Sequence, residues 1–97
     1  MNENYNEFEP RQRRFLMAYR RNMGSVSKAA QRAGVPRRTV YNWRSTNPEF
    51  HEACAAIDES HLDLAESKLL NLIEAGNERA IIYYLKTKGR SRGYGFA

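Results

Sequence analysis

The sequence has 97 residues, which is room for one domain or for one small domain with an appendage. Its hydrophobic content of 41% and charged content of 28% are typical of a globular chain rather than a disordered one. No apolar run approaches the roughly 20 residues that span a bilayer. The start is polar and acidic, so we expect no secretion signal, and the lone Cys54 indicates a cytoplasmic protein without disulfides.

Charge is distributed unevenly along the chain. Residues 1–47 hold 10 Lys and Arg against 3 Asp and Glu, whereas residues 48–88 hold 4 against 8. Residues 89–97 add Arg90 and Arg92, and the formal net charge is +5. A basic front part suits a polyanionic partner and an acidic back part does not, so the sequence predicts two parts with different roles.

Helical periodicity, together with Gly, Pro and capping residues between the periodic segments, predicts five helices and no strand. The expected helices cover residues 10–21, 26–33, 36–45, 48–75 and 77–88. We therefore expect an all-α fold. Residues 1–47 are expected to form a three-helix helix-turn-helix domain, with a loose polar lead at 1–9. Residues 48–88 are expected to form an antiparallel hairpin built on a long helix, and 89–97 a flexible basic tail.

A helix-turn-helix motif is indicated by residues 30–43. The crossing of its two helices requires a small residue in the first helix, a glycine in the turn and apolar residues on the inner face of the second helix. Ala30 precedes the turn residue Gly34 by four positions, and Val40 and Trp43 follow it by six and nine. These four residues meet all the requirements within one window.

The inward phase of Val40 and Trp43 places the neighbouring polar side chains outward or on the flanks of the third helix. Arginine can bind guanine and asparagine can bind adenine in the major groove of DNA, while the flanking cations suit phosphates. The candidate DNA-binding residues are Lys28, Arg37, Arg38, Thr39, Tyr41, Asn42, Arg44 and Ser45. The alternative is a three-helix domain with a solvated basic face, which we disfavour because the excess charge is confined to the motif region.

No catalytic or metal site is indicated. His51 and His61 lie ten residues apart, which is no metal-ligand spacing, and a zinc site needs about four ligands. The carboxylates of Asp58, Glu59 and Asp63 are read as solvated charges. No glycine-rich phosphate loop and no nucleophile with an adjacent base is found, so we expect no cofactor, no metal and no enzymatic activity.

The last predicted helix is apolar on nearly every side, from Ala80 to Leu85. One hairpin partner covers one side only, so we expect subunit contacts in preference to a tightly wrapped single-chain core. The candidate oligomer contacts are Leu69, Ile73, Ile82 and Tyr83, with Ile81, Tyr84 and Leu85 closing the hairpin.

Several runs resemble the homeodomain-like DNA-binding region of phage terminase small subunits and related prophage proteins. They are NMGSVSKAA at 22–30, AGV at 33–35, RTVYNWR at 38–44, NPEF at 47–50, GN at 76–77, AIIYYLKTKG at 80–89 and RGY at 92–94. The resemblance covers residues 8–94. It implies an oligomeric, ring-forming subunit in a bacterial host cell, which recognises viral DNA for packaging and acts with the large terminase subunit.

Two other functions are compatible with the sequence. A prophage or bacterial transcriptional regulator can use the same DNA-binding unit. An adaptor, whose helical back part binds protein while the front part serves as a scaffold, is the third class.

Overall fold

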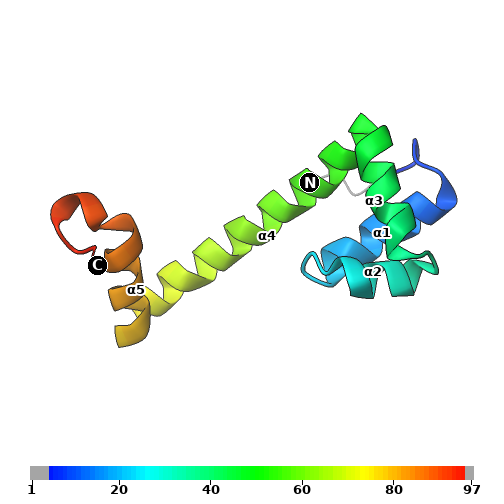
Figure 1. Cartoon of the computed structure of the whole chain (residues 1–97). Coiled ribbons are helices and arrows are strands. Elements are labelled where there is room, and N and C mark those ends of the chain that lie inside the picture. Colours follow the sequence, from blue (N-terminus) through cyan, green and yellow to red (C-terminus); the bar gives the residue numbers. More distant parts are fainter. Residues whose placement is uncertain (1–4, 96–97) are drawn as a thin grey trace. The chain divides into compact units, whose positions relative to one another are not determined.

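The computed structural model describes residues 5–95, and within these residues it is helical without strands. The helices are α1 (Pro10–Arg21), α2 (Val26–Ala33), α3 (Arg37–Thr46), α4 (Pro48–Glu74) and α5 (Glu78–Lys88), followed by a short 3₁₀ helix, η1 (Arg90–Arg92) (Figure 1). This confirms the all-α class. The chain divides between Leu62 and Asp63 into two compact units.

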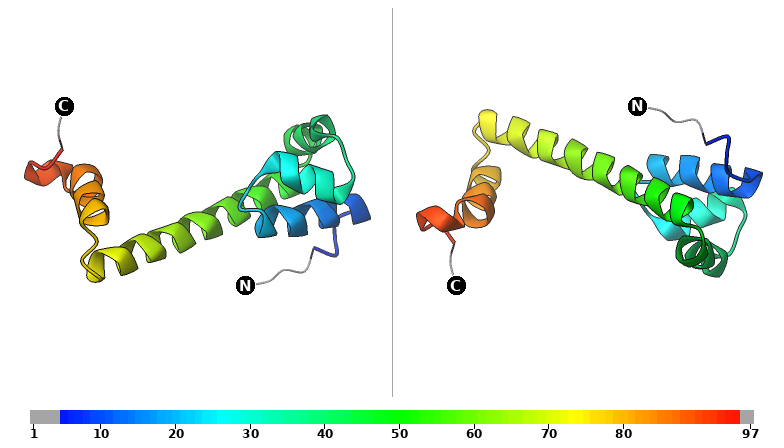
Figure 2. Two further views of the ribbon diagram at one scale, coloured as in Figure 1. Left: turned by 90° about the horizontal axis from the view of Figure 1, so that it is seen from below. Right: turned by 90° about the horizontal axis from the view of Figure 1, so that it is seen from above.

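The N-terminal unit is formed by α1, α2, α3 and the first part of α4, which lie together in both views of Figure 2. Its largest fully buried side chains are Phe15, Phe50, Leu16, Ile57 and Val40. The aromatic rings of this core contact one another, with centroids 5.8 Å apart for Phe15 and Phe50 and 5.4 Å apart for Trp43 and Phe50. Burial of these apolar side chains is the main force that holds the unit together.

The first part of α4 belongs to this core, which corrects the domain boundary expected at residue 47. Phe50, Cys54 and Ile57 follow one another at helical spacing and are 0%, 2% and 1% exposed. They pack into the same apolar cluster as the inner side chains of α1, α2 and α3. The unit therefore extends to Leu62, because three short helices alone leave one side of their core open and α4 covers it.

The lead before α1 is also more ordered than expected. Phe8 is 6% exposed and its ring meets that of Phe50 at 6.1 Å, edge to face, while Tyr5 packs partly against the same cluster. The side chain of Gln12 accepts a hydrogen bond from the Glu9 amide at 3.2 Å, which closes the start of α1. The prediction of a loose lead was thus wrong for residues 5–9. Residues 1–4 lie outside the described part of the chain.

The C-terminal unit contains the rest of α4, then α5 and η1. Gly76, with φ 85°, ends α4, and the Asn77 side chain accepts a hydrogen bond from the Ala80 amide at 2.9 Å, which caps α5. Helix α5 leaves the end of α4 at an open angle rather than lying along it (Figures 1 and 2). The expected antiparallel hairpin is therefore an open corner.

Few side chains of this unit are covered. Within residues 63–95, Ala80 is the one buried residue; Ile81 and Leu85 are half-buried and Tyr84 is 36% exposed. Ile81, Tyr84 and Leu85, which were expected to close the hairpin, are therefore only partly covered in a single chain. The tail expected to be flexible contains η1, where the Arg92 amide donates to the Gly89 carbonyl at 2.9 Å. Residues 96–97 lie outside the described part.

Candidate nucleic-acid interface

The turn between α2 and α3 has the geometry that the motif requires. Gly34 adopts φ 74°, in the left-handed region where a side chain is strained, and its amide donates to the Gln31 carbonyl at 3.2 Å. The Val35 amide donates to the Ala30 carbonyl at 3.0 Å. Ala30 is 2% exposed, so a small residue lies where the predicted crossing needs one.

The inner face of α3 is also as expected. Val40 is 0% and Trp43 8% exposed, and both belong to the core cluster. The indole ring of Trp43 contacts Phe50 and lies 5.7 Å below the guanidinium carbon of Arg11. With two inward side chains three residues apart, the rotation of α3 about its own axis is determined.

The four side chains expected to read bases lie together on the opposite face. Arg38, Tyr41, Asn42 and Ser45 are all exposed, Tyr41 by 51%. The Ser45 hydroxyl donates to the Asn42 carbonyl at 3.1 Å, so it is partly engaged within the helix. The outward surface of α3 thus combines a guanidinium, an amide, a phenol and a hydroxyl, which are groups that can hydrogen-bond to base edges.

Cations flank this face at the start of α2 and α3. Arg37 is exposed, and its Nη1 donates to the Ser27 hydroxyl at 3.2 Å, which ties the start of α3 to the start of α2. Lys28 is exposed and its amide donates to the Ser25 side chain, the N-cap of α2, at 3.3 Å. Both charges are available to phosphates beside a helix N-terminus.

Two residues at this flank were not among those predicted from the sequence. Ser27 contacts Arg37, and Arg32 lies one helical turn after Lys28 and lines the same shallow polar depression, together with Asn22 and Gln31. The spacing of four residues between Lys28 and Arg32 was the available signal, since it places both cations on one side of a helix.

Arg44 is a correction to the predicted set, and Thr39 is half-buried. The Arg44 guanidinium turns inward: its carbon lies 5.4 Å from the centroid of the Tyr19 ring, and its Nη2 donates to the Tyr19 hydroxyl at 3.0 Å. Arg44 lies on the flank of α3, where a long side chain can reach either solvent or the core. Because its partners in the core hold the guanidinium away from the outward face, Arg44 does not belong to the candidate interface.

Across residues 5–95, no group of three or more His, Cys, Asp or Glu side chains could hold a metal ion. Cys54 is 2% exposed, and burial raises the pKa of its thiol. Within the same residues, no helix is both long enough and apolar enough to cross a membrane.

Helices α2 and α3, with their glycine turn and the exposed polar face of α3, form a helix-turn-helix, a class of structure that places its second helix in the major groove of DNA. The comparison with protein families agrees: residues 8–48 match the model of a homeodomain-like domain. Residues 8–48 therefore form a helix-turn-helix that is similar to homeodomain-like domains, which indicates DNA binding. No curated protein and no solved structure matched the chain.

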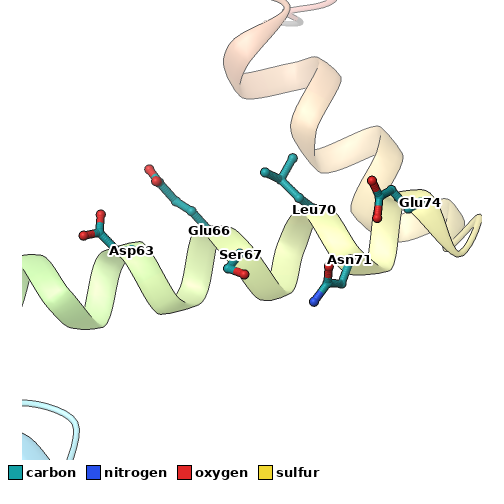
Figure 3. Close-up of a pocket in the computed structure, with 6 residues that line it drawn as sticks. All are labelled: Asp63, Glu66, Ser67, Leu70, Asn71 and Glu74. Carbon is teal, nitrogen blue, oxygen red and sulfur yellow. The ribbon is translucent and has the colours of Figure 1, made fainter.

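The residues expected to form subunit contacts lie in the C-terminal unit, outside that match. Leu69 and Ile73 are half-buried, whereas Ile82 and Tyr83 are 44% and 59% exposed. Another face of α4 in this unit is polar, with Asp63, Glu66, Ser67, Asn71 and Glu74 around Leu70 (Figure 3). The unit thus has exposed apolar side chains beside a separate acidic face.

Proposed function

We propose that this protein is a DNA-binding small terminase subunit, which recognises viral DNA for genome packaging as an oligomer, acts with the large terminase subunit and itself catalyses no reaction. The observation that carries the proposal is the exposed face of α3, with Arg38, Asn42 and Tyr41 held outward by the buried Val40 and Trp43. The packaging role rests on the family resemblance of residues 8–94.

In the proposed complex, α3 enters the major groove. Arg38 has the donors that suit O6 and N7 of guanine, and Asn42 can pair with N6 and N7 of adenine. Lys28 and Arg37 lie on the flank and would contact phosphates, which sets the register of α3 without reading sequence. Arg32, beside Lys28, would extend this phosphate contact along α2.

Assembly is supported by the apolar side chains that the C-terminal unit leaves exposed. Leu64, Leu70 and Leu72 of α4 are 46%, 48% and 48% exposed, and Ile82 and Tyr83 of α5 are also exposed. Large apolar side chains left in solvent on both helices of this unit are favourable to cover, and other chains are the natural cover. An oligomer would also bring several helix-turn-helix domains to one DNA molecule, which multiplies weak individual contacts.

A transcriptional regulator is the second candidate, because a homeodomain-like domain at residues 8–48 is compatible with either role. The two differ in assembly. A regulator of this class is expected to be a dimer on two half-sites spaced by about one helical turn of DNA. Native mass measurement of the full chain separates them: a dimer supports the regulator, and a larger closed assembly supports the packaging subunit.

Replacing Asn42 with alanine is expected to relax base preference. If Asn42 makes a bidentate contact with adenine, affinity for the preferred duplex falls by about 1–3 kcal/mol, while affinity for random duplex changes little. Competition binding with a duplex selected by the wild-type protein and with random duplex measures both. Lys28→Ala is the matched control and should weaken both affinities alike. An equal loss on both duplexes for Asn42→Ala would show that the reading face is misassigned.

Affinity for DNA is expected to fall steeply with salt. Each phosphate neutralised by a lysine or arginine releases counterions, so log affinity should decrease linearly with log salt concentration, by a slope of about 0.9 per contact. Titrations at several salt concentrations measure the slope, and Arg37→Gln should reduce it by about one contact. A flat titration would support the adaptor instead.

A further inference from the structure

We propose that Tyr19 and Asp58, neither of which lies on the DNA-reading helix, are positioning residues for base recognition. They act through Arg44, the guanidinium that turns inward from α3. The inference rests on the proposed DNA binding and adds to it two residues, from α1 and α4, that determine how sharply α3 discriminates between sequences.

One phenol hydroxyl joins three helices. Tyr19, on α1, donates its hydroxyl hydrogen to Oδ1 of Asp58, on α4, at 2.8 Å. The same hydroxyl oxygen accepts a hydrogen bond from Nη2 of Arg44, on α3, at 3.0 Å, and the guanidinium also packs over the Tyr19 ring. The chain Arg44–Tyr19–Asp58 therefore has the correct donor and acceptor at each step.

The hydroxyl is not needed for packing. The ring of Tyr19 stacks on Phe15 with centroids 5.3 Å apart, and Tyr19 is 3% exposed. A phenylalanine would fill the same space without carrying a polar atom into the core. Burying a hydroxyl beside a guanidinium destabilises the fold unless both are hydrogen-bonded. A phenylalanine ring at position 19 would therefore pack the core without that requirement.

The linkage fixes the end of α3 that carries most of the reading face. Tyr41, Asn42 and Ser45 lie within one turn of Arg44. Arg44 also interacts with the Cys54 thiol of α4, whereas the polar contact of Arg37 with Ser27, at the start of α3, is exposed. Val40 and Trp43 hold the helix by apolar contact, which tolerates small sliding, whereas hydrogen bonds are directional. Side chains that recognise a ligand must be positioned to within about 0.5 Å. The hydrogen bond of Arg44 therefore affects how accurately α3 places its base-reading side chains.

The protonation state of Tyr19 is consistent with this role. Burial raises the pKa of its hydroxyl, and the hydrogen bond to Asp58 raises it further, although Arg44 opposes the shift. The hydroxyl therefore keeps its proton at neutral pH and can donate to Asp58 while it accepts from Arg44.

The test measures the ratio of affinities for a wild-type-selected duplex and for random duplex, with the full chain. Tyr19→Phe and Asp58→Ala should each lower this ratio by about two- to tenfold, the worth of one hydrogen bond. Asp58→Asn keeps the acceptor oxygen and should restore it. Glu59→Ala removes the same charge from the neighbouring exposed position and should leave the ratio unchanged.

A purely structural role would shift thermal stability without moving the ratio, so both are measured, and binding is measured well below the unfolding midpoint. An unchanged ratio in folded Tyr19→Phe overturns the inference, even where Asp58→Ala fails to fold. Equal loss for Glu59→Ala and Asp58→Ala overturns it too, since net charge would then be the cause. If the wild-type protein shows no salt-dependent binding to any duplex, the proposed function itself fails.

Discussion

Replacing Trp43 with alanine is expected to destabilise the N-terminal unit by about 3–5 kcal/mol, the usual cost of emptying a buried aromatic site. The indole is 8% exposed and contacts the ring of Phe50, which itself lies against Phe15. Its removal therefore opens a cavity where α3 meets α4, and it takes away the ring below the Arg11 guanidinium. Domains of this size have only 5–15 kcal/mol of total stability, so the loss is a large fraction.

Denaturant unfolding followed by far-UV circular dichroism measures this loss at fixed protein concentration. Fluorescence is unsuitable because Trp43 is the one tryptophan of the sequence. Tyr41→Ala is the matched control on the same helix: its ring is 51% exposed, and the change should stay within about 0.5 kcal/mol. Equal unfolding midpoints for Trp43→Ala and the wild type would mean that the phase of α3 is wrong.

The helices of the N-terminal unit were predictable because their ends are determined locally. Pro10 begins α1, Ser25 caps α2 and Gly34 ends it, each through its own backbone or its own side chain. Such signals lie within a few residues of the feature that they determine. The predicted ranges of α1 and α2 agree with the structure to the residue for this reason.

The role of α4 and of Phe8 could not be read in the same way. Helical spacing of Phe50, Cys54 and Ile57 indicates an apolar face, but not whether that face covers the same chain or another one. Phe8 stands alone in a polar stretch, without the periodicity that marks an element. Both findings depend on contacts between segments far apart in the sequence, as in the meeting of the Phe8 and Phe50 rings.

The reading face of the candidate site followed from two inward residues, since helical geometry places every other side chain of α3 relative to Val40 and Trp43. Arg44 was misplaced because its position on the flank is compatible with two directions. The inward direction brings Arg44 to the ring and hydroxyl of Tyr19, 25 residues earlier on α1, and to Cys54 on α4, and no pattern within α3 contains that information.

The double replacement Ile82→Asp, Tyr83→Asp is expected to dissociate the proposed oligomer. Both side chains are exposed on α5, in a unit where Ala80 is the one buried residue among 63–95. Adjacent subunits would cover them, and two carboxylates in such an apolar interface could not be desolvated without partners. Sedimentation velocity at micromolar concentration should show the wild type as an assembly and the variant as a monomer.

The control adds the same two charges elsewhere in the unit. Ser67→Asp, Asn71→Asp places them on the acidic face of α4 beside Asp63 and Glu66 (Figure 3), and this variant should sediment like the wild type. Circular dichroism checks that helix content is retained in both. The dissociated variant should still bind DNA in a salt-dependent way, but more weakly, because single domains lose the gain from multivalent contact. A monomeric wild type, or an assembled double variant, would contradict subunit contact through Ile82 and Tyr83 and would leave the packaging role without its physical support.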